Sequence, residues 1–152
     1  MNSFGKLLRV DSQEVIMKKV QEIDLKHFPN PWSQSEWMTL NWAHHHLYTY
    51  TLGDEILGFA LFSIVTGDDV AHLLKICVCP PYRGTEVSNS FWISLLNELK
   101  QLGVSSVYLE VESTNLRAIK FYKKKNFEQL RVIKGFYSNG GDALTMNLTL
   151  PV

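Results

Sequence analysis

The stretch CPPYRGTEVSNSFWISLL, residues 79–96, has the pattern of a strand end, a short loop and the first turns of an apolar helix. A helix N-terminus offers unpaired backbone N–H groups and the positive end of the helix dipole, so this loop could bind a phosphate group. Glycines let a backbone approach an anion closely, but Glu86 and Ser88 stand where glycines would be most useful. The local shape favours anion binding and the side chains oppose it.

Glu110 is a carboxylate in the middle of the apolar run YLEVES, between Leu109 and Val111. Charged residues are seldom buried without a partner, so this position indicates a functional group, a sheet-edge position or a structural ion pair. Glu112 projects from the same face of the expected strand. The residues alone leave these alternatives open.

Two other groups of side chains could bind metals or react. Cys77 and Cys79 lie on one face of an expected strand, a geometry unsuited to a mutual disulfide, so we expect buried, free thiols in a reducing compartment. The three consecutive histidines at residues 44–46 cannot all face one ion from a regular element. We therefore expect solvated loop histidines and no metal site.

Hydrophobic periodicity and turn residues predict the order strand, two helices, three strands, helix, strand, helix and two strands. We expect strands within residues 6–12, 47–65, 68–80, 105–113 and 128–150, with turns at Gly53-Asp54 and near residues 139–141. Helices are expected within residues 13–28, from Ser33 onward, within 90–104 and within 114–127. Their predicted N-caps are Asp11 or Ser12, Ser33 with a capping box to Glu36, and Thr114 or Asn115. The strand within residues 68–80 is apolar enough to predict burial on both faces.

The composition fits one globular α/β domain over residues 1–152, because 45% of the residues are hydrophobic and 20% are charged. Fifteen Lys+Arg balance fifteen Asp+Glu, so direct binding to nucleic acid or to a membrane is not expected. The N-terminus shows no basic and apolar leader pattern, from which we expect a cytoplasmic location.

The element order and four segments resemble the GNAT superfamily of N-acetyltransferases, and within it the ribosomal-protein-alanine N-acetyltransferases. The segments are HFPNPWSQSEW, LKICVCPPYRG, LEVESTNLRAIKFYKKKNF and GGDALTMNL, which together span nearly the whole chain. The resemblance implies a mixed α/β (α+β) fold: a mainly antiparallel central sheet of about seven strands, flanked by about four helices. It also implies acetyl-CoA as cosubstrate and no metal.

The resemblance also implies which residues contact acetyl-CoA. In the family, one strand opens away from its neighbour and its backbone pairs with the pantetheine arm; Ile76, Cys77 and Val78 occupy those positions. The phosphate loop corresponds to Arg83, Gly84, Thr85, Glu86, Val87, Ser88 and Asn89. Asn115 matches a cofactor-contacting residue, although a simple N-cap explains it equally well.

The same resemblance places a base and an acid. Glu110 falls on the residue that takes a proton from the attacking amine, with Glu112 the weaker candidate, and Tyr122 on the residue that protonates the departing thiolate. Core packing is the alternative for Tyr122. Trp32 and Tyr137 lie where related enzymes line the acceptor groove, and core packing explains Trp32 equally well.

The phosphate loop departs from the family pattern of Arg/Gln-x-x-Gly-x-Gly/Ala, because Arg83 alone is kept. A Glu86 carboxylate about 4 Å from a phosphate would repel it by roughly 4 kcal/mol at an effective dielectric near 20. Pointing to solvent, the same carboxylate would stabilise the helix N-terminus by about 0.3–1 kcal/mol.

The resemblance does not fix the acceptor. The first hypothesis is acetylation of the N-terminal amine of a protein, such as a ribosomal protein. Acetylation of a small amine is a second. A degenerate domain that binds a partner without catalysis is a third, motivated by Glu86 and Ser88.

Overall fold

A computed structural model describes residues 5–11 and 14–151 of the chain. Seven strands form one sheet in the spatial order β1-β2-β3-β4-β5-β7-β6. They are β1 (Lys6–Val10), β2 (His45–Leu52), β3 (Glu55–Ser63), β4 (Val70–Val78), β5 (Ser106–Glu112), β6 (Glu128–Ile133) and β7 (Ala143–Thr149). Neighbouring strands are antiparallel except β4 and β5, which are parallel. The expected mixed, mainly antiparallel sheet is confirmed, and the single-domain assignment stays a prediction.

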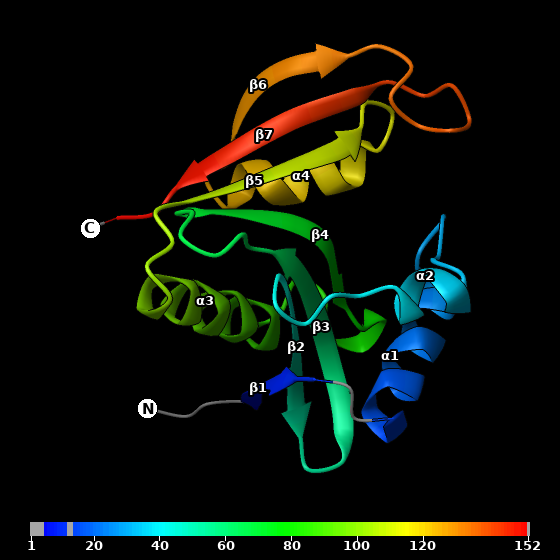
Figure 1. The fold of residues 1–152 in the computed structure, drawn as a ribbon, viewed down its shortest axis with the longest axis vertical. Helices are drawn as coiled ribbons and strands as arrows, with labels where there is room; N and C mark the ends of the chain where they lie inside the picture. The colour runs from blue at the N-terminus through cyan, green and yellow to red at the C-terminus, as the bar shows by residue number, and fades with distance from the viewer. Residues whose placement is uncertain (1–4, 12–13, 152) are drawn as a thin grey trace.

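The described residues also form four α-helices and one short 3-10 turn. These are α1 (Glu14–His27), α2 (Gln34–Met38), η1 (Pro80–Tyr82), α3 (Glu86–Gln101) and α4 (Leu116–Lys124). Figure 1 shows α1 and α2 on one side of β2 to β4 and α3 on the other. None of these helices is long and apolar enough to cross a membrane.

Apolar side chains cover both faces of the sheet. On one face the helices α3 and α4 bury Phe91, Trp92, Leu95, Leu99 and Ile119 against the strands. On the opposite face the helices α1 and α2 bury Met17, Val20 and Trp37. The sheet is therefore the middle layer of three, with helices packed against both of its faces.

Strand β4 contains a β-bulge at Leu74. Leu61 of β3 pairs with Lys75, whereas the next residue, Phe62, pairs with Leu73. A bulge sends two successive side chains to the same face. Leu73 packs on the α3 side, and Leu74 and Lys75 both turn to the α1 side. The expected burial of this strand on both faces is confirmed, because Ala71 and Leu73 are buried on the α3 side and Lys75 and Cys77 on the α1 side.

The parallel strands β4 and β5 pair only at their first residues. Val70, Ala71 and His72 pair with Ser106, Val107 and Tyr108, and no described residue beyond these continues the ladder. The two strands then diverge, as Figure 1 shows. Their facing edges therefore carry backbone N–H and C=O groups without a strand partner.

Two N-caps are confirmed. The Ser33 hydroxyl accepts the Glu36 N–H at 3.2 Å, and the Glu36 carboxylate accepts the Ser33 N–H at 3.0 Å, which completes the capping box of α2. Asn115 caps α4, since its side-chain oxygen accepts the Ala118 N–H at 3.2 Å. Of the caps expected for α1, Ser12 lies outside the described residues.

Three local expectations were wrong. Helix α3 begins at Glu86 rather than at Ser90. Strand β6 ends earlier than expected, at Ile133, so the turn expected near residues 139–141 lies within a longer loop of residues 134–142 that connects β6 to β7. The histidines are not all in a solvated loop, because His46 lies in β2, is buried and stacks on Tyr48.

We predict that Gly58→Ala destabilises the protein by about 1–3 kcal/mol. A Cβ at Gly58 would lie 2.6 Å from the Cys77 carbonyl oxygen and 2.9 Å from the Phe91 ring, and neither can move without shifting β4 or the core. Urea denaturation measures the loss. Gly141→Ala is the matched control, since its Cβ would meet the flexible Asn139 side chain at 2.9 Å. Equal losses in both variants would contradict the steric explanation.

Candidate functional site

A groove of about 870 Å³ opens where β4 and β5 diverge. The end of α1 and the loop after it, the C-terminal half of β4, the start of α3, the end of β5 and the start of α4 form its walls. Among the residues expected at a site, the groove is lined by Ile76, Cys77, Val78, Arg83, Gly84, Ser88, Glu110, Asn115, Tyr122 and Tyr137. The described residues Trp32, Thr85, Glu86, Val87 and Asn89 are not part of its lining.

In the β4 wall, the Val78 carbonyl already has a hydrogen-bond donor and the Cys77 thiol is unreactive. Arg83 donates from Nε to the Val78 carbonyl oxygen at 2.7 Å, so this carbonyl has a partner. Burial raises the pKa of the Cys77 thiol to about 11, so the thiol is protonated and unreactive at neutral pH. Both cysteines are free, as expected, but only Cys77 is buried, whereas Cys79 is partly exposed.

The start of α3 presents its backbone to the groove. Gly84 has a φ of +69°, a conformation that favours glycine, and it precedes the N-cap Thr85. The Thr85 hydroxyl makes no capping bond and donates instead to the Tyr82 carbonyl at 2.5 Å. Ser88 is buried and lines the groove, whereas Glu86 is exposed and lies outside its lining. The first-turn N–H groups therefore keep their capacity to bind an anion, and the Glu86 carboxylate does not occupy the groove.

Glu110 stands at the point where the strands separate. It lies two residues after Tyr108, the last residue of β5 that pairs with β4. Its side chain is 16% exposed, and its Oε1 accepts a hydrogen bond from His72 Nε2 at 2.6 Å. A half-exposed imidazole thus orients a mostly buried carboxylate beside the groove.

Two tyrosines flank the groove. Tyr122 of α4 packs edge-on against Phe127, with 5.4 Å between ring centroids. Burial, followed by the nearby Tyr137, raises the pKa of Tyr122 well above its usual range. Burial, followed by the carboxylates of Glu110 and Glu112, raises the pKa of Tyr137 to about 12. Both phenols are therefore protonated at neutral pH and can donate hydrogen bonds.

A hydrogen bond crosses one end of the groove. Asn30, in the loop after α1, donates from Nδ2 to Glu112 Oε1 at 3.2 Å. Trp32 follows in the same loop, but its ring packs on Trp37 at 5.1 Å between centroids. The structure thus favours the packing alternative for Trp32. Asn30 and Tyr137 line the groove, and Trp32 does not.

Among the polar residues of this region, sequence reasoning did not assign a role to Lys75, Asn30 and Arg117, which line the groove, or to His72, which touches Glu110. A lysine inside the apolar run LLKICV was a visible signal for Lys75. The other contacts join segments distant in sequence, such as His72 to Glu110, and no local pattern indicates them.

Comparison with known proteins identifies the fold and family. The model of the acetyltransferase (GNAT) family matches residues 17–127. A ribosomal protein bS18-alanine N-acetyltransferase of Haemophilus ducreyi is 29% identical over 107 residues, 70% of this chain and 72% of that protein.

Solved structures agree with that match. The ribosomal-protein-S18-alanine N-acetyltransferase of Escherichia coli has a TM-score of 0.83 at 22% identity, covering 98% of this chain and 96% of its own. Arabidopsis thaliana NAA60 in complex with acetyl-CoA has a TM-score of 0.77 at 17% identity, covering 95% and 98%. The family match spans most of the chain and its fold is the same, so the protein belongs to the GNAT family of acetyltransferases.

Proposed function

We propose that this acetyltransferase transfers the acetyl group of acetyl-CoA to the N-terminal amine of a protein. The observation that carries the proposal is the divergence of β4 from β5, with Glu110 at the point of separation. An open strand edge, anion-binding N–H groups and a carboxylate share one groove there. Thioester aminolysis needs these three features together.

The donor side of the groove suits an amide-bearing, phosphorylated ligand. The edge of β4 around Ile76 to Val78 has no partner in β5 and can pair with the amides of a pantetheine arm. The N-terminus of α3 and the guanidinium groups of Arg83 and Arg117 can hold the phosphates. Asn115 lines the groove and caps α4, so both roles coexist.

Glu110 would act as the general base. A protein α-amino group has a pKa of about 7.7–8.0, so at neutral pH it must lose a proton before its nitrogen attacks the thioester carbonyl. Glu110 accepts this proton, directly or through water, and His72 keeps the carboxylate in place. The nitrogen–carbon bond forms as the carbon–sulfur bond breaks.

Tyr122 would act as the general acid. Its raised pKa means that the phenol is protonated when the thiolate leaves. The hydroxyl can donate a hydrogen bond to the developing thiolate and pass it a proton. The ammonium nitrogen loses two protons in all. One passes to Glu110 and on to solvent, and the second, lost as the amide forms, balances the proton that Tyr122 gives to the thiolate.

The acceptor is proposed from the relatives and the shape of the site. Relatives of this chain are named ribosomal protein bS18-alanine N-acetyltransferases, so a protein N-terminus such as that of a ribosomal protein is the first candidate. Acetylation of a small amine and a non-catalytic binding role are the alternatives. A cytoplasmic location and the lack of direct nucleic-acid or membrane partners stay predictions from the sequence.

The decisive experiment is calorimetric titration with acetyl-CoA, followed by mass spectrometry of alanine-terminated peptides incubated with enzyme and acetyl-CoA. We expect binding and a 1:1 acetylated product. Glu86→Gly should bind acetyl-CoA within about twofold of the parent, because Glu86 lies outside the groove lining. Folded protein that binds no acetyl-CoA would contradict the proposal and favour a non-catalytic role.

We predict that Glu110→Gln lowers turnover at neutral pH by about 10²–10⁴-fold, because only proton removal is lost. Steady-state assays should show acetyl-CoA affinity nearly unchanged. Glu112→Gln is the matched control, since it also removes a carboxylate from this face of β5. The Glu112 carboxylate accepts from Asn30, whereas that of Glu110 accepts from His72. If both variants lose turnover equally, the effect is one of groove charge and Glu110 is not the base.

Tyr122→Phe should keep the packing against Phe127 and remove only the proton donor. We expect turnover to fall by about 10²-fold while thermal stability changes little. Single-turnover measurements isolate the chemical step. An unchanged single-turnover rate would return Tyr122 to a packing role.

A further inference from the structure

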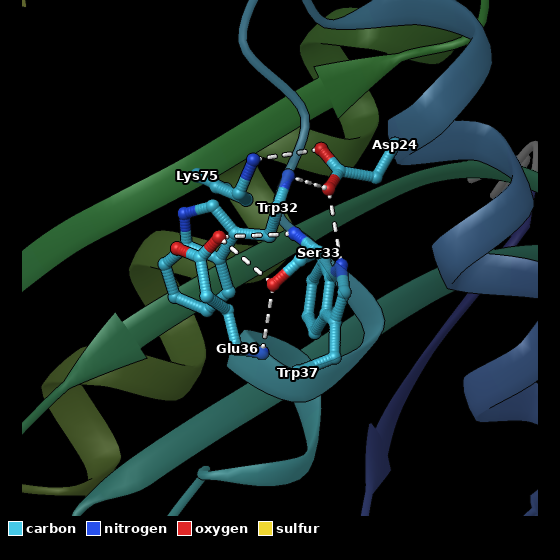
Figure 2. A network of polar contacts seen from close by, with 6 residues as sticks. All are labelled: Asp24, Trp32, Ser33, Glu36, Trp37 and Lys75. Carbon is cyan, nitrogen blue, oxygen red and sulfur yellow. Dashed lines mark hydrogen bonds and ion pairs between the residues drawn. The ribbon is translucent and has the colours of Figure 1, made fainter.

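Lys75, which lines the groove, forms a buried ion pair with Asp24, which does not. The Lys75 ammonium lies 2.7 Å from Asp24 Oδ1, with their side chains 4% and 0% exposed. The other carboxylate oxygen, Oδ2, accepts the Trp32 backbone N–H at 2.9 Å and the Trp37 indole N–H at 3.0 Å. As Figure 2 shows, one carboxylate thus gathers donors from β4, from the loop after α1 and from α2.

Aromatic rings enclose the Lys75 ammonium. It lies 4.2 Å from the ring centroid of Phe28, 5.1 Å from that of Trp32 and 6.0 Å from that of Trp37. Cation–π attraction compensates part of the solvation that the ammonium loses. The lysine therefore has a single well-defined environment, although burial lowers its pKa.

Stability alone is a poor explanation for such a pair. Removing two charges from water costs about as much as their attraction returns, and apolar pairs of similar volume often stabilise a protein equally well. Buried polar groups can instead select one arrangement of the elements that they join. The elements joined here therefore indicate what the pair is for.

The pair connects the two sides of the proposed reaction. Lys75 precedes Ile76, the first residue of the β4 edge that faces the open groove. The loop tied to Asp24 through the Trp32 N–H contributes Phe28, Pro29 and Asn30 to the groove lining. That loop then reaches across to Glu112 through Asn30. The ion pair therefore sets the distance between the donor strand and this opposing wall.

We propose that Asp24 and Lys75 are positioning residues that hold the loop of residues 28–33 as the acceptor wall of the groove. This inference rests on the proposed function for its acceptor and donor sides. Neither residue needs to touch the reacting atoms. Their loss should weaken acceptor binding and leave acetyl-CoA binding intact.

The test is the double variant Asp24→Asn with Lys75→Met. The asparagine oxygen still accepts from Trp32 and Trp37, and methionine fills the lysine stem, so the variant removes the ionic link to β4 together with the contacts of the ammonium with the aromatic rings. We expect the KM for an alanine-terminated peptide to rise about tenfold, with the acetyl-CoA dissociation constant within about twofold of the parent. Asp24→Asn alone is the second variant if the double variant does not fold.

Tyr48→Phe is the matched control, because it removes a part-buried hydrogen bond of a buried side chain, Tyr48 to Glu98, on the opposite face of the sheet. It should lower thermal stability and leave the peptide KM unchanged. An unchanged peptide KM in the charge variant overturns the proposal. So does a parallel rise in the peptide KM and the acetyl-CoA dissociation constant, which would indicate a general loss of structure.

Hydrogen exchange provides a readout that does not depend on catalysis. In the double variant the Trp32 amide should exchange about tenfold faster than in the parent, while amides of β5 and α3 keep their rates. Equal Trp32 rates would overturn the positioning role. Should the parent acetylate no peptide, the proposed function fails, and the exchange data still decide whether the pair holds the loop.

Discussion

The interruption of pairing between β4 and β5 is the constraint on which the rest of the site depends. Parallel pairing stops after His72 and Tyr108, yet backbone groups at the centre of a sheet must find partners. One of the backbone groups left without a strand partner is satisfied within the protein, since Arg83 donates a hydrogen bond to the Val78 carbonyl. The remainder is an unsatisfied edge inside a groove, and a ligand rich in amides is the natural partner. A continuous central ladder would be more stable but would leave no place for such a ligand.

The departure of the phosphate loop from its family pattern has a structural explanation. Helix α3 begins at Glu86, whose exposed side chain is not part of the groove lining, whereas Gly84 and Ser88 on either side of it are. Ser88 is small enough to be buried at the second position. Within this loop the residue with a positive φ is Gly84, at +69°, so the conformation that favours glycine lies there. Arg117, from α4, adds a cation that the loop pattern does not contain.

Local patterns predicted the element order, the capping box at Ser33 and the cap at Asn115, because each depends on neighbouring residues. The mixed, mainly antiparallel sheet was implied by the family resemblance. They could not predict the bulge at Leu74, which is set by the register of β4 against β3. Nor could they predict the partners of Glu110 and Asp24, which lie 38 and 51 residues away. A buried charge in the sequence indicates that a partner exists, and only the fold identifies it.

The bulge and the ion pair act together. Without the extra residue at Leu74, strand alternation would send Lys75 toward α3, and Asp24 on the α1 side would be a buried carboxylate without a cation. With it, the strand that opens toward β5 also anchors the loop opposite. The bulge in β4 therefore affects both the β4 side of the groove and the wall formed by the loop after α1. If the positioning role proposed for Asp24 and Lys75 holds, substitutions that alter acceptor choice are to be sought at Phe28, Pro29 and Asn30, which line the groove from the loop tied to Asp24.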